Sequence, residues 1–260
     1  MILGCLDEKE HVSQCSLVCR EWVYPAQRHL FYSILLSEAR VSKIEDSKLG
    51  EMLSQGSYLV SFVHELALMR CYAHIVPVVD LGTLIWAISS LPNLRTLHLC
   101  GVNLKPPQIQ RELYLPSCGP TMRLDLLKLS DVTIVVTENS PHSCSFLGLV
   151  GSFQSIRRLE IVNLFISSSS QHVPKQVFLP KISRVQGTFL PVGSVLRALQ
   201  AGIDRDSLEY IGFRLKSNAD IPGISDCLYT FTQLRSLSFS IAQFQHSKGI
   251  HGYPLSKSLP

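Results

Sequence analysis

Charged residues are scarce in this sequence. Asp, Glu, Lys and Arg make up 17% of the 260 residues, against about 25% in a typical soluble domain. The formal net charge is only +4, which is too small to argue for nucleic-acid binding. Leu and Ser fill the deficit with 39 and 33 copies. So much leucine excludes intrinsic disorder, which requires low hydrophobicity and high net charge.

No segment predicts a membrane span or a secretory signal. The best candidate span, residues 75–91, contains Pro77 and Asp80, and a carboxylate at mid-membrane costs roughly 2.5–3.5 kcal/mol. We interpret this segment as a buried helix and expect no membrane partner. The start of the chain turns acidic at Asp7 and Glu8, whereas a signal peptide opens with positive charge and a longer apolar stretch.

The eight cysteines are scattered along the chain without a C-x-x-C pair, and no N-x-[ST] glycosylation motif occurs. Eight cysteines in a chain of this length are too few for a disulfide scaffold. Both features favour reduced thiols, and we therefore predict a cytoplasmic or nuclear protein.

The known catalytic motifs are incomplete in this sequence. His64 and Glu65 lack the second His of a zinc-protease helix, and residues 223–227 lack the last Gly of a nucleophile elbow. No phosphate-cradling glycine loop occurs. Cys15 and Cys19 lie one helical turn apart, but no His or Asp completes a tetrahedral metal site with them. We predict no enzyme activity, no metal and no cofactor.

The main signal is a repeated pattern, aliphatic-x-x-aliphatic-x-aliphatic. Its middle positions are residues 66, 97, 127, 159, 185, 211 and 237, so the spacings are 31, 30, 32, 26, 26 and 26. The apolar content alone would give roughly ten chance matches, but chance would not space them regularly. The last two apolar residues of each copy share strand parity, which predicts one short strand per copy. We expect Leu97 and Leu129 to be fully buried on adjacent strands.

This pattern resembles the leucine-rich repeat, a family in which a horseshoe-shaped solenoid carries a parallel sheet on its concave side. A regular repeat has Asn or Cys three residues after its third apolar position, whereas Val102, Val132 and Leu164 occupy that slot here. The resemblance implies an α/β fold, a leucine-rich-repeat-like solenoid of about seven degenerate repeats over residues 60–245. A tail follows over residues 246–260.

The first 36 residues predict a small helical module. Apolar residues recur there at helical spacing, and Pro25 is expected to interrupt the helix; the recurring residues are Val12, Cys15, Val18, Cys19 and Trp22. Residues 37–59 are interpreted as a connecting or capping helix. From the pattern alone, the module is equally well explained as an N-terminal cap that covers the first exposed face of the solenoid.

Residues 15–22, Cys-Ser-Leu-Val-Cys-Arg-Glu-Trp, and residues 30–34, Leu-Phe-Tyr-Ser-Ile, resemble the second half of an F-box. The likeness is to the form common in mushroom-forming fungi, where an F-box precedes degenerate leucine-rich repeats. In that family the F-box docks on the Skp subunit of an SCF-type ubiquitin ligase, and the repeats hold a protein substrate. The resemblance therefore implies a substrate adaptor. It places Leu17, Val18 and Trp22 on the Skp side, or else in the core of a small three-helix unit.

A complete F-box opens with Leu-Pro and a further helix, and residues 1–6 retain little of it. We therefore expect an F-box truncated at its N-terminus that binds Skp weakly. The alternative is a leucine-rich-repeat-like binding protein, or a decayed F-box copy, that no longer engages Skp.

Strand alternation predicts which side chains line the concave face. From the third to the sixth repeat, the candidate partner-binding residues on this face are Lys128, Arg158, Glu160, Arg184, Gln186, Tyr210 and Arg214. Arg158 and Arg184 are expected in the same column on successive strands. Such a column suits an acidic or phosphorylated segment of an unknown protein substrate. The alternative is that the cations are simply solvated on an exposed face.

Overall fold

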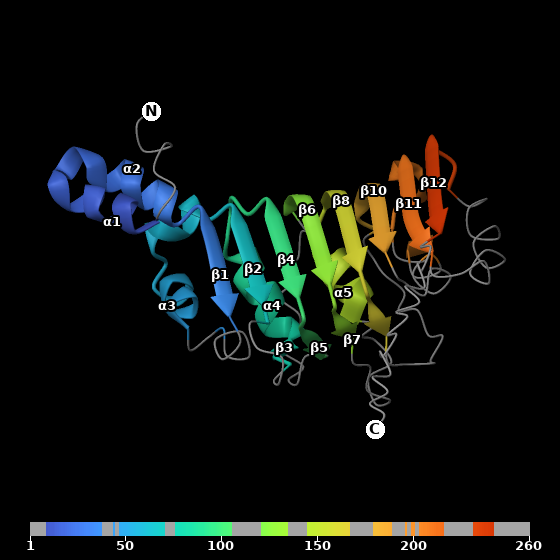
Figure 1. The fold of residues 1–260 in the computed structure, drawn as a ribbon, viewed down its shortest axis with the longest axis horizontal. Coiled ribbons are helices and arrows are strands. Elements are labelled where there is room, and N and C mark those ends of the chain that lie inside the picture. The colour runs from blue at the N-terminus through green and yellow to red at the C-terminus, as the bar shows by residue number, and fades with distance from the viewer. Residues whose placement is uncertain are drawn as a thin grey trace, which may run out of the picture.

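A parallel sheet of eight strands is the centre of the computed structural model (Figure 1). The structure describes residues 9–37, 44, 47–70, 76–105, 121–134, 145–166, 179–188, 196, 199–200, 203–215 and 231–241. In chain order the strands are β1 (Ser33–Ser37), β2 (Glu65–Met69), β4 (Thr96–Cys100), β6 (Arg123–Ser130), β8 (Ser155–Val162), β10 (Lys181–Thr188), β11 (Tyr210–Leu215) and β12 (Ser236–Ile241). They keep this order in space, and each strand is parallel to the next.

A bulge at the start of several strands explains why apolar residues three apart point to the same face. Two consecutive N–H groups donate to one carbonyl oxygen, that of the residue directly before the neighbouring strand, as Asp125 and Leu126 do to Arg95 at 2.8 and 3.1 Å. The extra residue breaks the strict alternation of a strand. Leu124 and Leu127 are therefore both buried. The same pairing opens the ladder at His64 with Glu65, Arg95 with Thr96, and Arg235 with Ser236.

A second parallel sheet consists of four short strands, β3 (Val78–Asp80), β5 (Asn103–Lys105), β7 (Thr133–Ile134) and β9 (Phe165–Ile166). The chain enters β5, β7 and β9 through a residue in the left-handed conformation: Gly101 (φ 64°), Asp131 (φ 52°) and Asn163 (φ 52°). The backbone N–H of each donates to the last residue of the next strand of the larger sheet, at 2.8, 2.8 and 3.1 Å. These bonds satisfy backbone groups of the turns, for which a regular leucine-rich repeat would use an Asn side chain. The position three residues after the third apolar residue of the pattern therefore holds a buried apolar residue: Val102, Val132 or Leu164.

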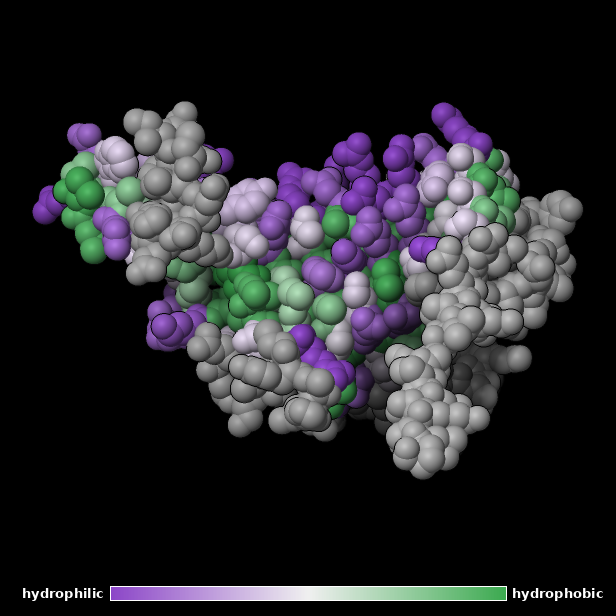
Figure 2. All heavy atoms as spheres, viewed as in Figure 1, coloured by the Kyte–Doolittle hydropathy of each residue, from purple (hydrophilic) through white to green (hydrophobic). Residues whose placement is uncertain are grey.

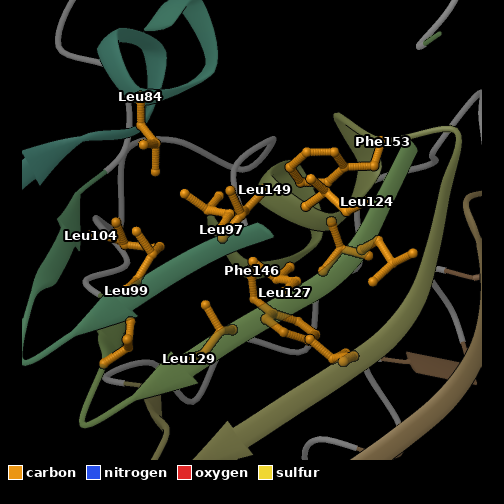
Figure 3. Close-up of a cluster of buried hydrophobic side chains, with 14 of the residues drawn as sticks. Leu84, Leu97, Leu99, Leu104, Leu124, Leu127, Leu129, Phe146, Leu149 and Phe153 are labelled. Carbon is orange, nitrogen blue, oxygen red and sulfur yellow. The ribbon is translucent and has the colours of Figure 1, made fainter. Parts of the chain in front are cut away.

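Two helices lie behind the larger sheet and cover its buried face (Figure 1). They are α4 (Leu81–Ser89) and α5 (Ser145–Gly151). Asp80 caps α4, because its carboxylate accepts the N–H of Thr83 at 3.0 Å, so segment 75–91 contributes the expected buried helix. Figure 3 shows the core between helices and strands, where side chains from α4, β4, β5, β6 and α5 meet, all fully buried: Leu84, Leu97, Leu104, Leu127, Phe146 and Leu149.

Helices α1 (Lys9–Val18) and α2 (Arg20–Leu30) pack together beyond β1 at one end of the sheet (Figure 1). The break between them is at Cys19, which is extended (φ −158°, ψ 162°). Pro25 lies inside α2, so the predicted interruption there is wrong: the loss of one backbone hydrogen bond does not end this helix. Helix α3 (Lys48–Ser54) and the 3-10 helix η3 (Tyr58–Phe62) connect β1 to β2.

The predicted leucine-rich-repeat-like solenoid is wrong as the fold class: the structure is an α/β fold around a parallel eight-stranded sheet. The regular spacing shows only that the chain returns to the same edge before each strand, which holds for any sheet of parallel strands. The described returns are not equivalent units. α3 and η3 precede β2, β3 and α4 precede β4, α5 precedes β8, and the short 3-10 helix η4 (Arg205–Ser207) precedes β11.

The predicted helical module of residues 1–36 also needs correction, because its last residues form a strand. β1 pairs in parallel with β2, with Ile34 opposite Leu66 and Leu36 opposite Leu68. The Leu-Phe-Tyr-Ser-Ile segment therefore leads from α2 directly into the sheet. The predicted strands at the seven repeat positions are present as β2, β4, β6, β8, β10, β11 and β12.

Substitution of Leu97 tests whether this face of the sheet forms the core. Leu97 and Leu129 are 0% exposed on the neighbouring strands β4 and β6, as the sequence predicts. Leu97→Ala should lower the free energy of unfolding by ~2–5 kcal/mol, because it leaves a cavity between β4 and the helices. Urea unfolding measures this value. Leu35→Ala is the control, since Leu35 is 57% exposed and should cost less than ~1 kcal/mol. Equal effects of the two substitutions would contradict this description of the core.

Substitution of Gly101 tests the left-handed turn that leads out of the larger sheet after β4. An Ala at this position must adopt a positive φ, which costs roughly 1–2 kcal/mol, and its Cβ would lie 2.8 Å from Cβ of Arg70. Gly56 has a similar φ of 61° with nothing within 4 Å. Gly56→Ala should therefore show the backbone cost alone, and Gly101→Ala should be the more destabilising of the two by thermal or urea unfolding. The reverse order would contradict this turn.

Candidate protein-interaction site

One face of the eight-stranded sheet is turned away from α4 and α5, and we call it the open face (Figure 2). Its side chains alternate with the buried ones, and strand register arranges them in three columns across the sheet. The first column holds Glu65, Thr96, Leu126, Arg158, Arg184, Tyr210 and Ser236; the middle one holds Leu35, Ala67, His98, Lys128, Glu160, Gln186, Gly212 and Ser238; the third holds Met69, Cys100, Ser130, Val162, Thr188, Arg214 and Ser240.

All the side chains predicted to line the sheet lie on this face. Arg158 and Arg184 are direct register partners on β8 and β10, as expected, and Tyr210 is the partner of Arg184 on β11. Lys128, Glu160 and Gln186 are successive members of the middle column. Arg214 lies apart from both groups in the third column, opposite Thr188.

The two central arginines are in different electrostatic states. Nε of Arg158 lies 2.9 Å from Oε1 of Glu160, and the Arg158 side chain is 46% exposed. Such an exposed pair contributes about 0–1 kcal/mol to stability. The exposed Arg184 has no ion-pair or hydrogen-bond partner for its guanidinium among the described residues. The guanidinium of Arg184 is therefore available to a ligand.

Tyr210 lies over the backbone of its own strand. A Cβ placed on Gly212 would be 2.5 Å from the Tyr210 hydroxyl oxygen and 2.9 Å from Cε1, so only glycine leaves room for the ring there. The ring therefore extends along β11 over Gly212. A glycine inside a strand is a signal of such close approach, and Gly212 is a functional position that the repeat pattern does not indicate.

His98 lies at the centre of the open face and was not singled out from the sequence. It is half-buried on β4, and its Nε2 is 3.5 Å from Oγ of Ser130. Burial lowers the pKa of His98, and the charge of Lys128 lowers it further, while Glu160 partly opposes the shift. Burial also raises the pKa of the neighbouring Cys100 thiol, with Asp131 adding to the effect. Both groups are therefore uncharged at neutral pH.

The open face is apolar at its β1 end. Leu35 is 57% exposed, and Ala67 and Met69 beside it on β2 are half-buried. Tyr32, which is 44% exposed, stacks on His64 with ring centroids 4.7 Å apart. Figure 2 shows the hydrophobic surface over β1 and β2 giving way to hydrophilic surface over β6, β8 and β10.

The helical pair carries a separate exposed surface. Leu17 and Val18 at the end of α1 are 84% and 73% exposed, so they do not belong to the core of the described structure. Trp22 on α2 is half-buried. Leu17 and Val18 are therefore accessible to a partner, whereas Trp22 is only partly accessible.

The helical pair is fixed to the sheet through α2 and η3. Ala26 is fully buried, the rings of Tyr24 and Phe62 meet edge-on at 5.0 Å, and the Tyr58 hydroxyl donates to Oε1 of Gln27 at 2.6 Å. These contacts set the orientation of α1 and α2 relative to the first strands of the sheet.

Within the described part of the chain, no three His, Cys, Asp or Glu side chains come together in a way that could hold a metal ion. None of the described helices has the length and apolar character that a membrane crossing needs. Comparison with protein-family models gives no match, and comparison with curated proteins gives none either.

The depressed pKa of His98 predicts how stability depends on pH. The unfolded chain takes up a proton at this residue below about pH 6.5, whereas the folded chain does so only at a lower pH. Stability should therefore fall as the pH drops through this window, because the unfolded state binds more protons. His98→Gln should flatten the dependence measured by urea unfolding between about pH 7.5 and 5.5. An unchanged slope would contradict the role assigned to His98.

Proposed function

We propose that this chain is a protein-interaction adaptor of F-box type. Helices α1 and α2 dock on the Skp subunit of an SCF-type ubiquitin ligase, and the open face of the sheet holds a protein substrate. In this proposal the chain performs no chemistry itself and works in the cytoplasm or the nucleus. The observation that carries the proposal is the exposure of Leu17 and Val18, two adjacent large apolar side chains at the end of α1.

Exposed apolar side chains of this kind favour a protein contact. Burying a Leu or Val side chain contributes roughly 1.5–3 kcal/mol, and apolar surface that is left exposed together marks sites where proteins bind. The sequence around Leu17 and Val18 is also the part that resembles an F-box. The exposure and the resemblance therefore support the same role for the same residues.

The placement of the two surfaces supports an adaptor. The helical pair lies beyond β1 at one end of the sheet (Figure 1), while the polar part of the open face lies over β6 to β10 (Figure 2). A partner on α1 therefore leaves that part of the sheet accessible. The fixed contact between α2 and η3 would hold the two partners in a constant relative orientation, which a ligase needs in order to present its substrate.

Skp binding tests the proposal. We expect a purified fungal Skp subunit to bind the chain weakly, since the apolar contact described on the helical pair is small. Leu17→Ala combined with Val18→Ala should weaken that binding by at least about tenfold. Isothermal titration calorimetry measures the affinity, and thermal unfolding should be unchanged because both side chains are exposed.

Leu35→Ala is the matched control, because it removes a similarly exposed apolar side chain from the sheet instead of the helices. It should leave Skp binding unchanged. Absence of Skp binding, or equal binding by the double variant, would contradict the adaptor role. The open face would then support a protein-binding module that does not engage Skp.

A further inference from the structure

We infer that the open face binds an extended peptide segment in which a bulky apolar side chain lies about four to seven residues from a pair of carboxylates. The apolar side chain lies on β1 and β2, and the carboxylates reach Arg158 and Arg184 on β8 and β10. The inference rests on the proposed function, because it names the chemistry of the substrate that the adaptor would hold.

The Lys and Arg side chains in the three columns of the open face are confined to one part of it. From β6 to β11 the three columns carry Lys128, Arg158, Arg184 and Arg214 against the single acid Glu160. The exposed Asp125 of β6 lies outside these columns. On β1 and β4 the outward positions of the described strands carry no Lys or Arg. The His98 ring on β4 is uncharged at neutral pH. This surface therefore attracts negative charge over β8 and β10, where a ligand's acidic end would lie.

The two arginines suit separate carboxylates. They occupy neighbouring strands about 4.8 Å apart, and each guanidinium presents a planar set of donors that matches one carboxylate. Arg184 has no side-chain partner among the described residues. The side chains of the Arg158–Glu160 pair are 46% and 22% exposed, so solvent reaches the guanidinium and the net energy of the pair is small. An incoming acidic residue can therefore compete with Glu160 for Arg158 at little cost.

The other end of the face favours an apolar side chain. Leu35 is 57% exposed, beside the half-buried Ala67 and Met69. Covering Leu35 removes apolar surface from water, which stabilises a complex by about 25 cal/mol per Å². The exposed ring of Tyr32, stacked on His64, extends this apolar surface at the start of β1.

The distance between the two ends sets the spacing in the ligand. β8 and β10 are three and four steps from β2, and four and five steps from β1, so the ends are roughly 14–24 Å apart. An extended peptide covers about 3.3 Å per residue, which corresponds to about four to seven residues. A nucleic acid fits less well, since its charge recurs at every nucleotide while the β1 and β2 end is apolar and Glu65 on β2 is acidic.

The probe is a random peptide display library selected against the full chain, followed by fluorescein-labelled synthetic copies of the selected peptides. We expect the selected peptides to combine a bulky apolar residue with an acidic pair at the inferred spacing. Selection of peptides without acidic residues, or no selection at all, would overturn the inference. Binding only when the acidic pair is replaced by phosphoserine would also overturn it, as would tighter binding of a single-stranded RNA oligonucleotide.

Substitutions then locate the binding on the open face. Arg158→Ala with Arg184→Ala should weaken binding by at least about tenfold and reduce its salt dependence. Arg28→Ala with Arg205→Ala is the matched control: both arginines are exposed on helices outside the sheet, and the change in net charge is identical. The control should alter the affinity less than about twofold. Equal effects of the two double variants would show that only net charge matters, and would overturn the inference.

Two single substitutions complete the test. Glu160→Gln should raise the affinity for the acidic peptide about threefold at low salt, because it frees Arg158 and removes a repulsive charge. Leu35→Ser should weaken peptide binding several-fold without affecting Skp, whereas Leu17→Ser should weaken Skp binding only. A chain that binds peptide but not Skp would thus contradict the adaptor role alone, and one that binds Skp but not peptide would overturn this inference alone.

Discussion

Burial of one face of the eight-stranded sheet is the constraint on which the rest of this structure depends. Each central strand contributes fully buried apolar side chains to that face, and α4 and α5 cover them with residues such as Leu84 and Phe146. Since each such side chain contributes roughly 1.5–3 kcal/mol when buried, the strands have no freedom to slip by one residue. Slippage would move the whole apolar set to the opposite side.

The same constraint creates the open face. Fixing Leu97, Leu127 and Leu159 inward necessarily places His98, Lys128 and Glu160 outward in neighbouring strands. The bulge that opens several strands interrupts the alternation once, so that a third apolar residue also points inward, and the alternation continues after it. Functional side chains on such a sheet are held by a rigid backbone. This preorganisation reduces the entropy lost when a partner binds.

The adaptor proposal and the peptide inference rely on surfaces with different chemistry. Leu17 and Val18 form an apolar contact on the helical pair, whereas Arg158 and Arg184 provide localised positive charge on the sheet. The contacts of Tyr24 and Gln27 with η3 connect the two parts of the molecule. An apolar contact mainly gives affinity, while localised charge gives selectivity and faster encounter, so the two surfaces can be tuned independently.

Local periodicity and spacing were enough to predict the positions of seven strands and the buried helix in segment 75–91. The burial of Leu97 and Leu129 and the pairing of Arg158 with Arg184 follow from the same two features. Tertiary structure alone decided the fold class, since parallel strands at regular intervals are common to several architectures. It also decided that residues 33–37 join the sheet as β1, where pairing with β2 overrides the helical pattern before them. The environments of Leu35 and His98 depend on strand neighbours some 30 residues away in the sequence, and that of Gly212 depends on the direction of the Tyr210 ring. No local sequence pattern contains this information.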